Sequence, residues 1–321
     1  MEPSLTQTAR KIRTAVIGAG YFGSFHAAKY AGLPCAELVA VCDHQAEKAS
    51  EIAARFGARA VSDHRDLLGN VDAVSIAVPL SDHYGVAHDF LAAGADVLIE
   101  KPMCSSLDEA DALIDLAARG ARILQVGHLE RFSPIVEAIK HAAAAPIHIE
   151  TRRIAPFRPR ATDTSAVMDM MSHDLDHALS LTGASISTIE AEGQSLLTEH
   201  LDLVHAKLVF SNGCTAQMTA SRVGLKIERS MAIVERDRYI AADMVDNRLL
   251  VTRRSHAHAG AAASAGENLP PSDNLQRQIE SFLDAVTTRR QPVASGREIR
   301  PVLAAAIEIV ERAEAWRRRQ G

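Results

Sequence analysis

The chain has 321 residues, of which 47% are hydrophobic and 23% are charged, and its formal net charge is −5. A chain this long exceeds the size at which one hydrophobic core stops growing, so two domains are expected. The small negative charge gives no reason to expect nucleic acid as a partner, and no apolar run is long enough to span a membrane. Four cysteines without paired spacing predict a cytoplasmic protein with neither disulfides nor a metal, and residues 1–10 are expected to be a frayed tail.

A glycine-rich loop follows the first expected strand, at 12–17. The sequence Gly18-Ala19-Gly20-Tyr21-Phe22-Gly23 runs directly into a helix. Its glycines would allow a tight turn, the approach of a pyrophosphate and close helix packing, respectively. A second strand at 37–42 ends in Asp43, 20 residues after Gly23, and His44 follows. An acid there bonds the adenosine ribose and repels a 2′-phosphate, which favours NAD over NADP; an acidic turn residue is the alternative.

Strand and helix patterns alternate through residue 126. Helices are expected near 47–56, 83–93 and 107–118, and strands at 59–61, 72–78, 96–100 and 122–126. This alternation predicts a doubly wound parallel sheet, the Rossmann fold, for a domain spanning 1–126. Glu100-Lys101-Pro102 stands at the end of the strand 96–100. Because ligands bind outside the carboxyl ends of such strands, Lys101 is expected beside the nicotinamide; a solvated surface lysine is the alternative.

The second domain, 127–321, is expected to be built on a large, mainly antiparallel sheet. Its strands are predicted at 147–153, 186–197, 204–210, 214–222, 229–234, 239–244 and 248–253, and its helices at 164–182, 272–289 and 297–318. Asn212-Gly213 is a strong hairpin signal and Asp246-Asn247 a weaker one. The low-complexity segment 255–266 is expected to be a mobile loop, whose two histidines lack a third metal ligand.

Asp169 and His173 stand four residues apart on the helix expected at 164–182, so they share one face, which His177 continues. A histidine oriented by an acid can accept the proton that leaves when a hydroxyl group is oxidised. The alternative is a surface pair that contributes roughly 0.2–0.5 kcal/mol.

Four arginines precede that helix within nine residues: Arg152, Arg153, Arg158 and Arg160. Guanidinium groups match phosphate oxygens, which favours a diphosphate ligand. Neighbours on a strand point to opposite faces, so Arg152 and Arg153 cannot both serve one site. The alternative is an exposed basic segment.

Together these motifs resemble the Gfo/Idh/MocA family of NAD(P)-dependent sugar and polyol dehydrogenases over nearly the whole chain. The resemblance rests on the glycine loop, on Val78-Pro79 followed by His83, on Glu100-Lys101-Pro102 and on the Asp169 and His173 pair. It implies that Lys101, Asp169 and His173 line the substrate site, with His173 as the acid/base. The implied cofactor is NAD, with contacts from Gly18, Gly20, Tyr21, Phe22, Gly23, Asp43, His44, Val78, Pro79, His83, Glu100, Lys101 and Arg131.

Segments 126–132 and 155–163 are similar to those of bacterial UDP-N-acetylglucosamine 3-dehydrogenases. This similarity implies oxidation at C3 of the sugar nucleotide, followed by an aminotransferase that leads to diamino-sugar lipid A. The UDP-sugar is expected to contact Lys101, Arg152, Arg158, Arg160, Asp169 and His173. The family also implies a homo-oligomer, a dimer or tetramer, formed through the C-terminal sheet. The alternatives are a dehydrogenase of another sugar nucleotide, a free sugar or inositol, and a non-catalytic NAD-binding regulator, against which the retained site residues argue.

Overall fold

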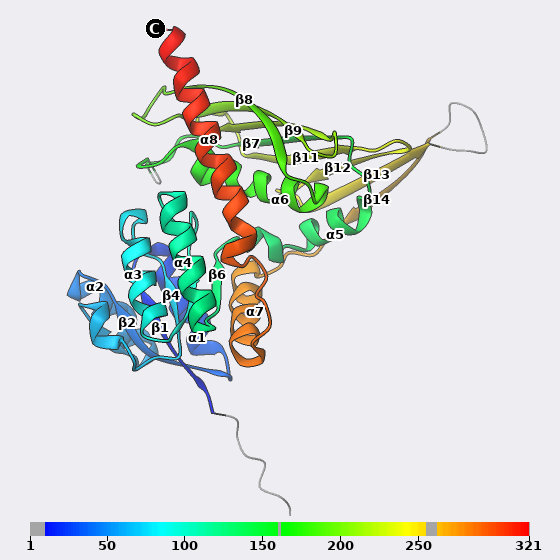
Figure 1. Cartoon of the computed structure of the whole chain (residues 1–321). Helices are drawn as coiled ribbons and strands as arrows, with labels where there is room; N and C mark the ends of the chain where they lie inside the picture. Colours follow the sequence, from blue (N-terminus) through cyan, green and yellow to red (C-terminus); the bar gives the residue numbers. More distant parts are fainter. Residues whose placement is uncertain (1–9, 160–161, 255–261, 321) are drawn as a thin grey trace, which may run out of the picture. The chain divides into compact units, whose positions relative to one another are not determined.

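The computed structural model describes residues 10–159, 162–254 and 262–320 (Figure 1). The chain divides into two compact units. One comprises residues up to 128 together with 275–298, and the other comprises 129–274 together with the residues from 299 onward. The sequence predicted one boundary, after residue 126. In the structure the chain also returns to the first unit at residues 275–298.

The first unit is the predicted Rossmann domain, and the strands of its parallel sheet have the order β3-β2-β1-β4-β5-β6. Its strands are β1 (Ile12–Ile17), β2 (Ala36–Cys42), β3 (Arg59–Val61), β4 (Ala73–Ile76), β5 (Asp96–Ile99) and β6 (Leu124–Val126). Its helices include α1 (Tyr21–Gly32), α2 (Ala46–Phe56), the short η1 (His64–Leu67), α3 (Leu80–Ala92) and α4 (Leu107–Gly120). The strand order reverses between β1 and β4, and dinucleotides bind at such a switch point.

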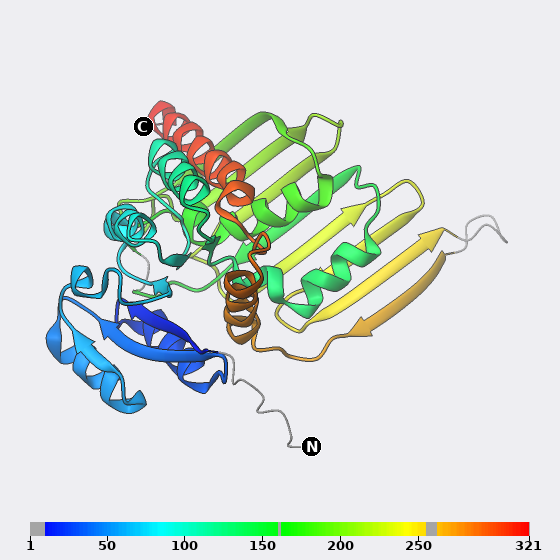
Figure 2. The same cartoon turned by 60° about the horizontal axis from the view of Figure 1, so that its bottom comes forward.

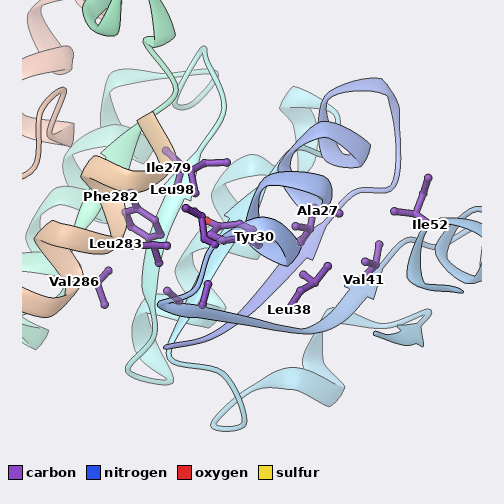
Figure 3. Packing of buried hydrophobic residues seen from close by; sticks show 14 of the residues in the cluster. Ala27, Tyr30, Leu38, Val41, Ile52, Leu98, Ile279, Phe282, Leu283 and Val286 are labelled. Atoms are coloured by element: carbon purple, nitrogen blue, oxygen red, sulfur yellow. The ribbon is translucent and has the colours of Figure 1, made fainter. Parts of the chain in front are cut away.

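Helix α7 (Asn274–Thr288) lies far along the chain from these strands, yet it packs into the core of the first unit. Its Ile279, Phe282 and Leu283 are buried in one cluster with Leu98 of β5 and Tyr30 of α1 (Figure 3). Burying a large apolar side chain stabilises a fold by about 1.5–3 kcal/mol. This burial explains why α7, which the sequence assigned to the second domain, belongs to the first.

The second unit is built on an eight-stranded sheet in the order β14-β13-β12-β11-β7-β10-β9-β8 (Figure 2). Its strands are β7 (His148–Ile154), β8 (Ile186–Gln194), β9 (Leu203–Phe210), β10 (Thr215–Ser221), β11 (Glu228–Val234), β12 (Arg238–Asp243), β13 (Arg248–Arg254) and β14 (Ala262–Asn268). Among the described pairs, β7 with β10 is the parallel one and the others are antiparallel. The predicted fold class is thus confirmed for both units.

Helices and short turns of the second unit are η2 (Leu129–Phe132), α5 (Pro134–Ala142), η3 (Val167–Met171), α6 (Ser172–Thr182) and most of α8 (Gly296–Gln320). Helix α5 packs on β12 and β13, and η3 packs on β10. Figure 2 shows α5 and α6 over the same face of the sheet. The opposite face of β11, β12 and β13 exposes Val234, Tyr239 and Leu250.

Some elements differ from the sequence prediction. Helix α5 was not predicted, and the helix expected at 164–182 is divided into η3, a π turn, and α6. Strand β14 forms where the mobile loop was expected, because its backbone pairs with β13; residues 255–261, like the expected tail at 1–9, lie outside the described part. Both hairpin signals are confirmed, since Gly213 and Asn247 have φ values of +85° and +51° in the connecting turns.

Candidate functional site

Gly18 and Gly23 are required by close backbone contacts. Gly18 has a φ of +97°, and a Cβ atom there would lie 2.4 Å from the carbonyl oxygen of Ala77. A Cβ atom on Gly23 would lie 1.7 Å from the carbonyl oxygen of Gly18. At Gly20, by contrast, no described atom beyond its chain neighbours lies within 4 Å of the equivalent point. The loop therefore leaves open space at Gly20, which caps the N-terminus of α1.

This space fits the pyrophosphate of NAD. Helix α1 has no acidic residue in its first turn, and the N–H groups and dipole of a helix N-terminus favour an anion. Asp43 follows β2, and its Oδ2 accepts a hydrogen bond from the backbone N–H of Ala19 at 2.8 Å. Its Oδ1 accepts one from Gln45 at 2.9 Å and lies 3.5 Å from Nδ1 of the exposed His44. The acid expected at the ribose therefore also holds the glycine loop.

Glu100 is held by a chain of buried polar groups. His26 places Nε2 3.1 Å from Oε1 of Glu100 and Nδ1 2.9 Å from Oγ of Ser75. The Ser75 hydroxyl also lies 2.7 Å from the hydroxyl of Tyr30, whose pKa is raised by burial. A Cβ atom on Gly127 would lie 2.7 Å from the same carboxylate oxygen of Glu100. The sequence did not reveal His26, Ser75 or Tyr30, because the helix and strand patterns marked them as ordinary core positions.

Lys101 follows β5 and is half-buried. The adjacent backbone is fixed by His83 of α3, which is 3% exposed. Its Nδ1 lies 2.9 Å from the carbonyl oxygen of Pro102, and its Nε2 lies 3.0 Å from that of Val78. Burial lowers the pKa of His83, and the contacts with the two carbonyl oxygens oppose that shift. His83 therefore joins the segments that follow β4 and β5, and so positions the backbone of Lys101.

The other predicted cofactor residues of the first unit lie around the same strand ends. Tyr21 and Phe22 begin α1 and are 66% and 41% exposed. Pro79 caps the N-terminus of α3. The first unit thus brings the predicted glycines, Asp43, Val78 and Glu100 to one edge of its sheet, the edge formed by the carboxyl ends of its strands.

In the second unit, Asp169 lies in the π turn η3 and His173 in the first turn of α6. Asp169 is half-buried and His173 is 9% exposed. The hydroxyl of Ser172 donates to the carbonyl oxygen of Met168 at 2.9 Å inside the wide turn. π turns within helices occur frequently at functional sites. The structure therefore places the predicted acid and imidazole four residues apart, the acid in the π turn and the imidazole in the α-helix that continues it.

A buried charge cluster lies beside His173. Arg153 donates to Oε1 and Oε2 of Glu130 at 2.7 and 2.8 Å and to Oδ1 of Asp174 at 2.7 Å. His177 places Nε2 3.2 Å from Oε2 of Glu130. Burial alone would raise the pKa of Glu130, but the charge of Arg153, then that of His173, and hydrogen bonds hold it well below its ordinary value. Glu130 is therefore held in its charged form, and the sequence revealed neither Glu130 nor Asp174 as part of the cluster.

The predicted arginines have different surroundings. Arg152 is exposed on the face of β7 opposite to Arg153 and lies 2.8 Å from Glu228. Arg158 is exposed in the segment after β7, and Arg160 lies outside the described residues. Arg131, expected at the cofactor, donates to both carboxylate oxygens of the buried Asp176 at 2.6–3.0 Å. The opposite orientation of Arg152 and Arg153 agrees with the alternation that the sequence predicted.

The described residues contain neither a metal-binding cluster nor a membrane-spanning helix. No group of three or more histidine, cysteine, aspartate or glutamate side chains there could hold a metal ion. None of the helices in the described ranges is both long and apolar enough to cross a bilayer.

Comparison with known proteins agrees with this geometry. Residues 12–128 match the GFO/IDH/MocA oxidoreductase family with its NAD-binding Rossmann fold, and residues 143–234 match the GFO/IDH/MocA C-terminal domain. The chain is 38% identical over 312 residues to a UDP-N-acetylglucosamine 3-dehydrogenase from Acidithiobacillus ferrooxidans, covering 96% of this chain and 99% of that one.

Two solved structures and one further relative are also similar to the chain. A crystal structure of UDP-N-acetylglucosamine 3-dehydrogenase GnnA from A. ferrooxidans superimposes with a TM-score of 0.90 at 39% identity, covering 95% of this chain and 98% of that one. An inositol 2-dehydrogenase from Rubrobacter xylanophilus is 31% identical over 58% of this chain and 57% of its own. A levoglucosan dehydrogenase in complex with NADH shares the fold, with a TM-score of 0.85 at 20% identity, covering 96% of this chain and 98% of that one.

Proposed function

Because the chain belongs to the Gfo/Idh/MocA family of NAD-dependent oxidoreductases, we propose that it oxidises the C3 hydroxyl of UDP-N-acetylglucosamine to the 3-keto sugar nucleotide. The observation that carries this proposal is the 38% identity, over 96% of the chain, to a protein of that named activity. The candidate site supports it, since Lys101, Asp169 and His173 supply an amine, an acid and an imidazole for alcohol oxidation. Oxidation of inositol is the second candidate, favoured by 31% identity over a shorter segment.

The chain's own residues would supply the proton transfer and the charge stabilisation. When bound in the first unit, NAD supplies the acceptor for the hydride that leaves C3. Lys101 would donate a hydrogen bond to the C3 oxygen and stabilise its developing negative charge. His173 would accept the hydroxyl proton, and Asp169 would orient His173 or the sugar. This division of roles needs no metal ion.

Binding of the nucleotide would use groups remote from the reacting carbon. A diphosphate carries two negative charges, and Arg158 presents an exposed guanidinium group in the second unit. Arg152, which the sequence also assigned to the substrate, lies on the face of β7 opposite to Arg153 and is paired with Glu228, so it is left out of this proposal. Binding energy from a remote part of the substrate can hold C3 in place without taking part in the chemistry. We propose Arg160 as a further arginine that binds the diphosphate.

Three further expectations belong to the same proposal. A 3-keto sugar nucleotide is the substrate that an aminotransferase needs for installing an amine, so we place such an enzyme next in the sequence of reactions, on the way to diamino-sugar lipid A. The cysteines at 35, 42, 104 and 214 are all free, which suits the reducing cytoplasm. The exposed sheet face of the second unit would pair with that of another copy.

The test is incubation of the protein with NAD and a panel of UDP-sugars, free sugars and inositols, while formation of NADH is followed. Oxidation of an alcohol by NAD is unfavourable near neutral pH, so a carbonyl trap is included. The proposal expects UDP-N-acetylglucosamine to react fastest and mass spectrometry to find a product two hydrogens lighter, with the carbonyl located at C3 by NMR. Faster oxidation of an inositol would replace the proposal by its alternative.

A further inference from the structure

The cluster of Glu130, Arg153 and Asp174 contains one more acidic than basic side chain. Its two carboxylates share the single guanidinium of Arg153, with contacts of 2.7–3.2 Å. Arg153 and Asp174 are 4% and 2% exposed, so water screens the remaining charge poorly. Two carboxyl groups thus face one guanidinium group in the interior of the second unit.

The carboxylate of Glu130 lies beside the imidazole groups of α6. Its Oε2 lies 3.2 Å from Nε2 of His177, and the charge of His173 lowers the pKa of Glu130. Electrostatic coupling between two groups is reciprocal. His173 stands one helical turn before His177 on α6 and next to Asp174, which Arg153 joins to Glu130, so the carboxylate of Glu130 lies close enough to act on both imidazoles.

The remaining charged groups on the neighbouring elements do not cancel this effect. Arg131 of η2 is paired with Asp176 of α6, and both are largely buried. Strand β10, which packs on η3, carries no charged residue. The charged or titratable groups on η2, η3, α6 and the buried face of β7 are Glu130, Arg131, Arg153, Asp169, Asp174, Asp176 and His177. His148, Glu150 and Arg152 lie on the opposite face of β7. Acids outnumber the arginines in this set.

We propose that Glu130 is a positioning residue for the acid/base reaction, which fixes α6 at His173 and stabilises the imidazolium that His173 becomes. The inference rests on the proposed role of His173 in the oxidation. In that step the O–H bond at C3 breaks and its proton moves to His173, while the C3–H bond breaks and its electron pair leaves with the hydride for NAD. Glu130 stays ionised throughout and touches neither the substrate nor the cofactor.

The decisive variant is Glu130→Gln, which keeps the size of the side chain and removes its charge. Without that charge His173 is a weaker base, so kcat should fall on the order of tenfold. The same loss lets His173 deprotonate at lower pH, so the midpoint of the acid limb of the kcat–pH profile should move to lower pH. The affinity for NADH, measured by fluorescence, should stay unchanged.

Further variants separate charge from packing. Glu130→Asp keeps the charge, so the acid-limb midpoint should stay in place even where kcat falls. Asp174→Asn removes the other carboxylate and should also move the midpoint downward, which keeps the proposal testable where Glu130→Gln does not fold. Glu235→Gln is the matched control: Glu235 is a buried carboxylate that lies 2.8 Å from Arg238, but it stands in the turn between β11 and β12. This control should leave the midpoint unchanged.

A parallel measurement on His173→Asn distinguishes two failures. If turnover collapses in His173→Asn but neither Glu130→Gln nor Asp174→Asn moves the midpoint, the role of Glu130 is refuted and the proposed function stands. If His173→Asn turns over almost normally, the proposed role of His173 fails, and the role of Glu130 fails with it.

Discussion

Oδ2 of Asp43 accepts a hydrogen bond from the backbone N–H of Ala19 at 2.8 Å, so the acid at the end of β2 is bonded to the glycine loop itself. The carboxylate that would select the cofactor's ribose therefore also fixes the loop that holds its pyrophosphate. Cofactor choice and loop geometry are coupled through this one side chain.

The first prediction concerns this coupling. The unmodified protein should use NAD with a much higher kcat/KM than NADP. Asp43→Ala should lower the ratio of kcat/KM for NAD to that for NADP, because it removes the charge that repels the 2′-phosphate. Asp43→Ala should also weaken NAD binding, since the N–H of Ala19 loses its acceptor. Initial-rate kinetics with both cofactors checks this, and a preference of the unmodified protein for NADP would contradict it.

The second prediction concerns the catalytic residues. Lys101→Ala should leave NADH binding nearly intact and lower kcat by orders of magnitude, because the ammonium acts mainly on the transition state. His173→Asn should lower kcat roughly 10²- to 10⁴-fold, the usual contribution of a general base. Near-normal turnover in both variants would show that the chemistry is done elsewhere.

The third prediction concerns stability and pH. Burial would raise the pKa of Asp202, but hydrogen bonds from the backbone N–H groups of Leu197, Thr198 and Leu196 and from the Thr198 hydroxyl lower it below its ordinary value. A carboxyl group with a lowered pKa in the folded state stabilises the protein above the unfolded pKa, about 3.9, and loses this contribution as the pH falls through the folded value.

Asp202→Asn should therefore destabilise the second unit by about 1–3 kcal/mol at pH 7. The difference between variant and unmodified protein should shrink as the pH falls below about 4. Urea unfolding at a series of pH values measures it. A difference that stays constant down to pH 3 would mean that the carboxylate charge contributes nothing.

The fourth prediction concerns assembly. Val234, Tyr239 and Leu250 are 37–45% exposed on one face of the second sheet, and antiparallel sheets often leave one face free for a partner. Light scattering should give a dimer or tetramer, and Tyr239→Glu should reduce the mass. Lys48→Glu, on the exposed side of helix α2 in the first unit, serves as a surface control. A monomeric mass for the unmodified protein at assay concentration would rule this assembly out.

Local motifs account for what the sequence predicted well. The glycine loop, Asp43 and the strand end at Lys101 depend on neighbouring residues and on one regular topology, so their shared location at one sheet edge followed from spacing. The hairpins at Gly213 and Asn247 followed from turn chemistry. These features need no knowledge of distant contacts.

Long-range contacts account for what it missed. Helix α7 joins the first unit because Phe282 and its neighbours enter a core that includes Leu98, which no local pattern reveals. The π turn before His173 could not be recognised, because the sequence there has the pattern of an ordinary α-helix. Glu130 and Asp174 were not recognised as members of a buried cluster, because charged residues are usually exposed. Only the folded chain shows that both are paired with the buried Arg153.

The ratio of kcat/KM for UDP-N-acetylglucosamine to that for free N-acetylglucosamine tests the central proposal most directly. Measured with NAD and a carbonyl trap, this ratio should be large, because arginine contacts to the diphosphate position the sugar. Arg158→Ala should reduce the ratio while changing turnover of the free sugar little, and Arg254→Ala, an exposed arginine at the end of β13, should leave it unchanged. If the free sugar reacts as well as its UDP conjugate, the nucleotide-sugar proposal is wrong and oxidation of a free sugar replaces it.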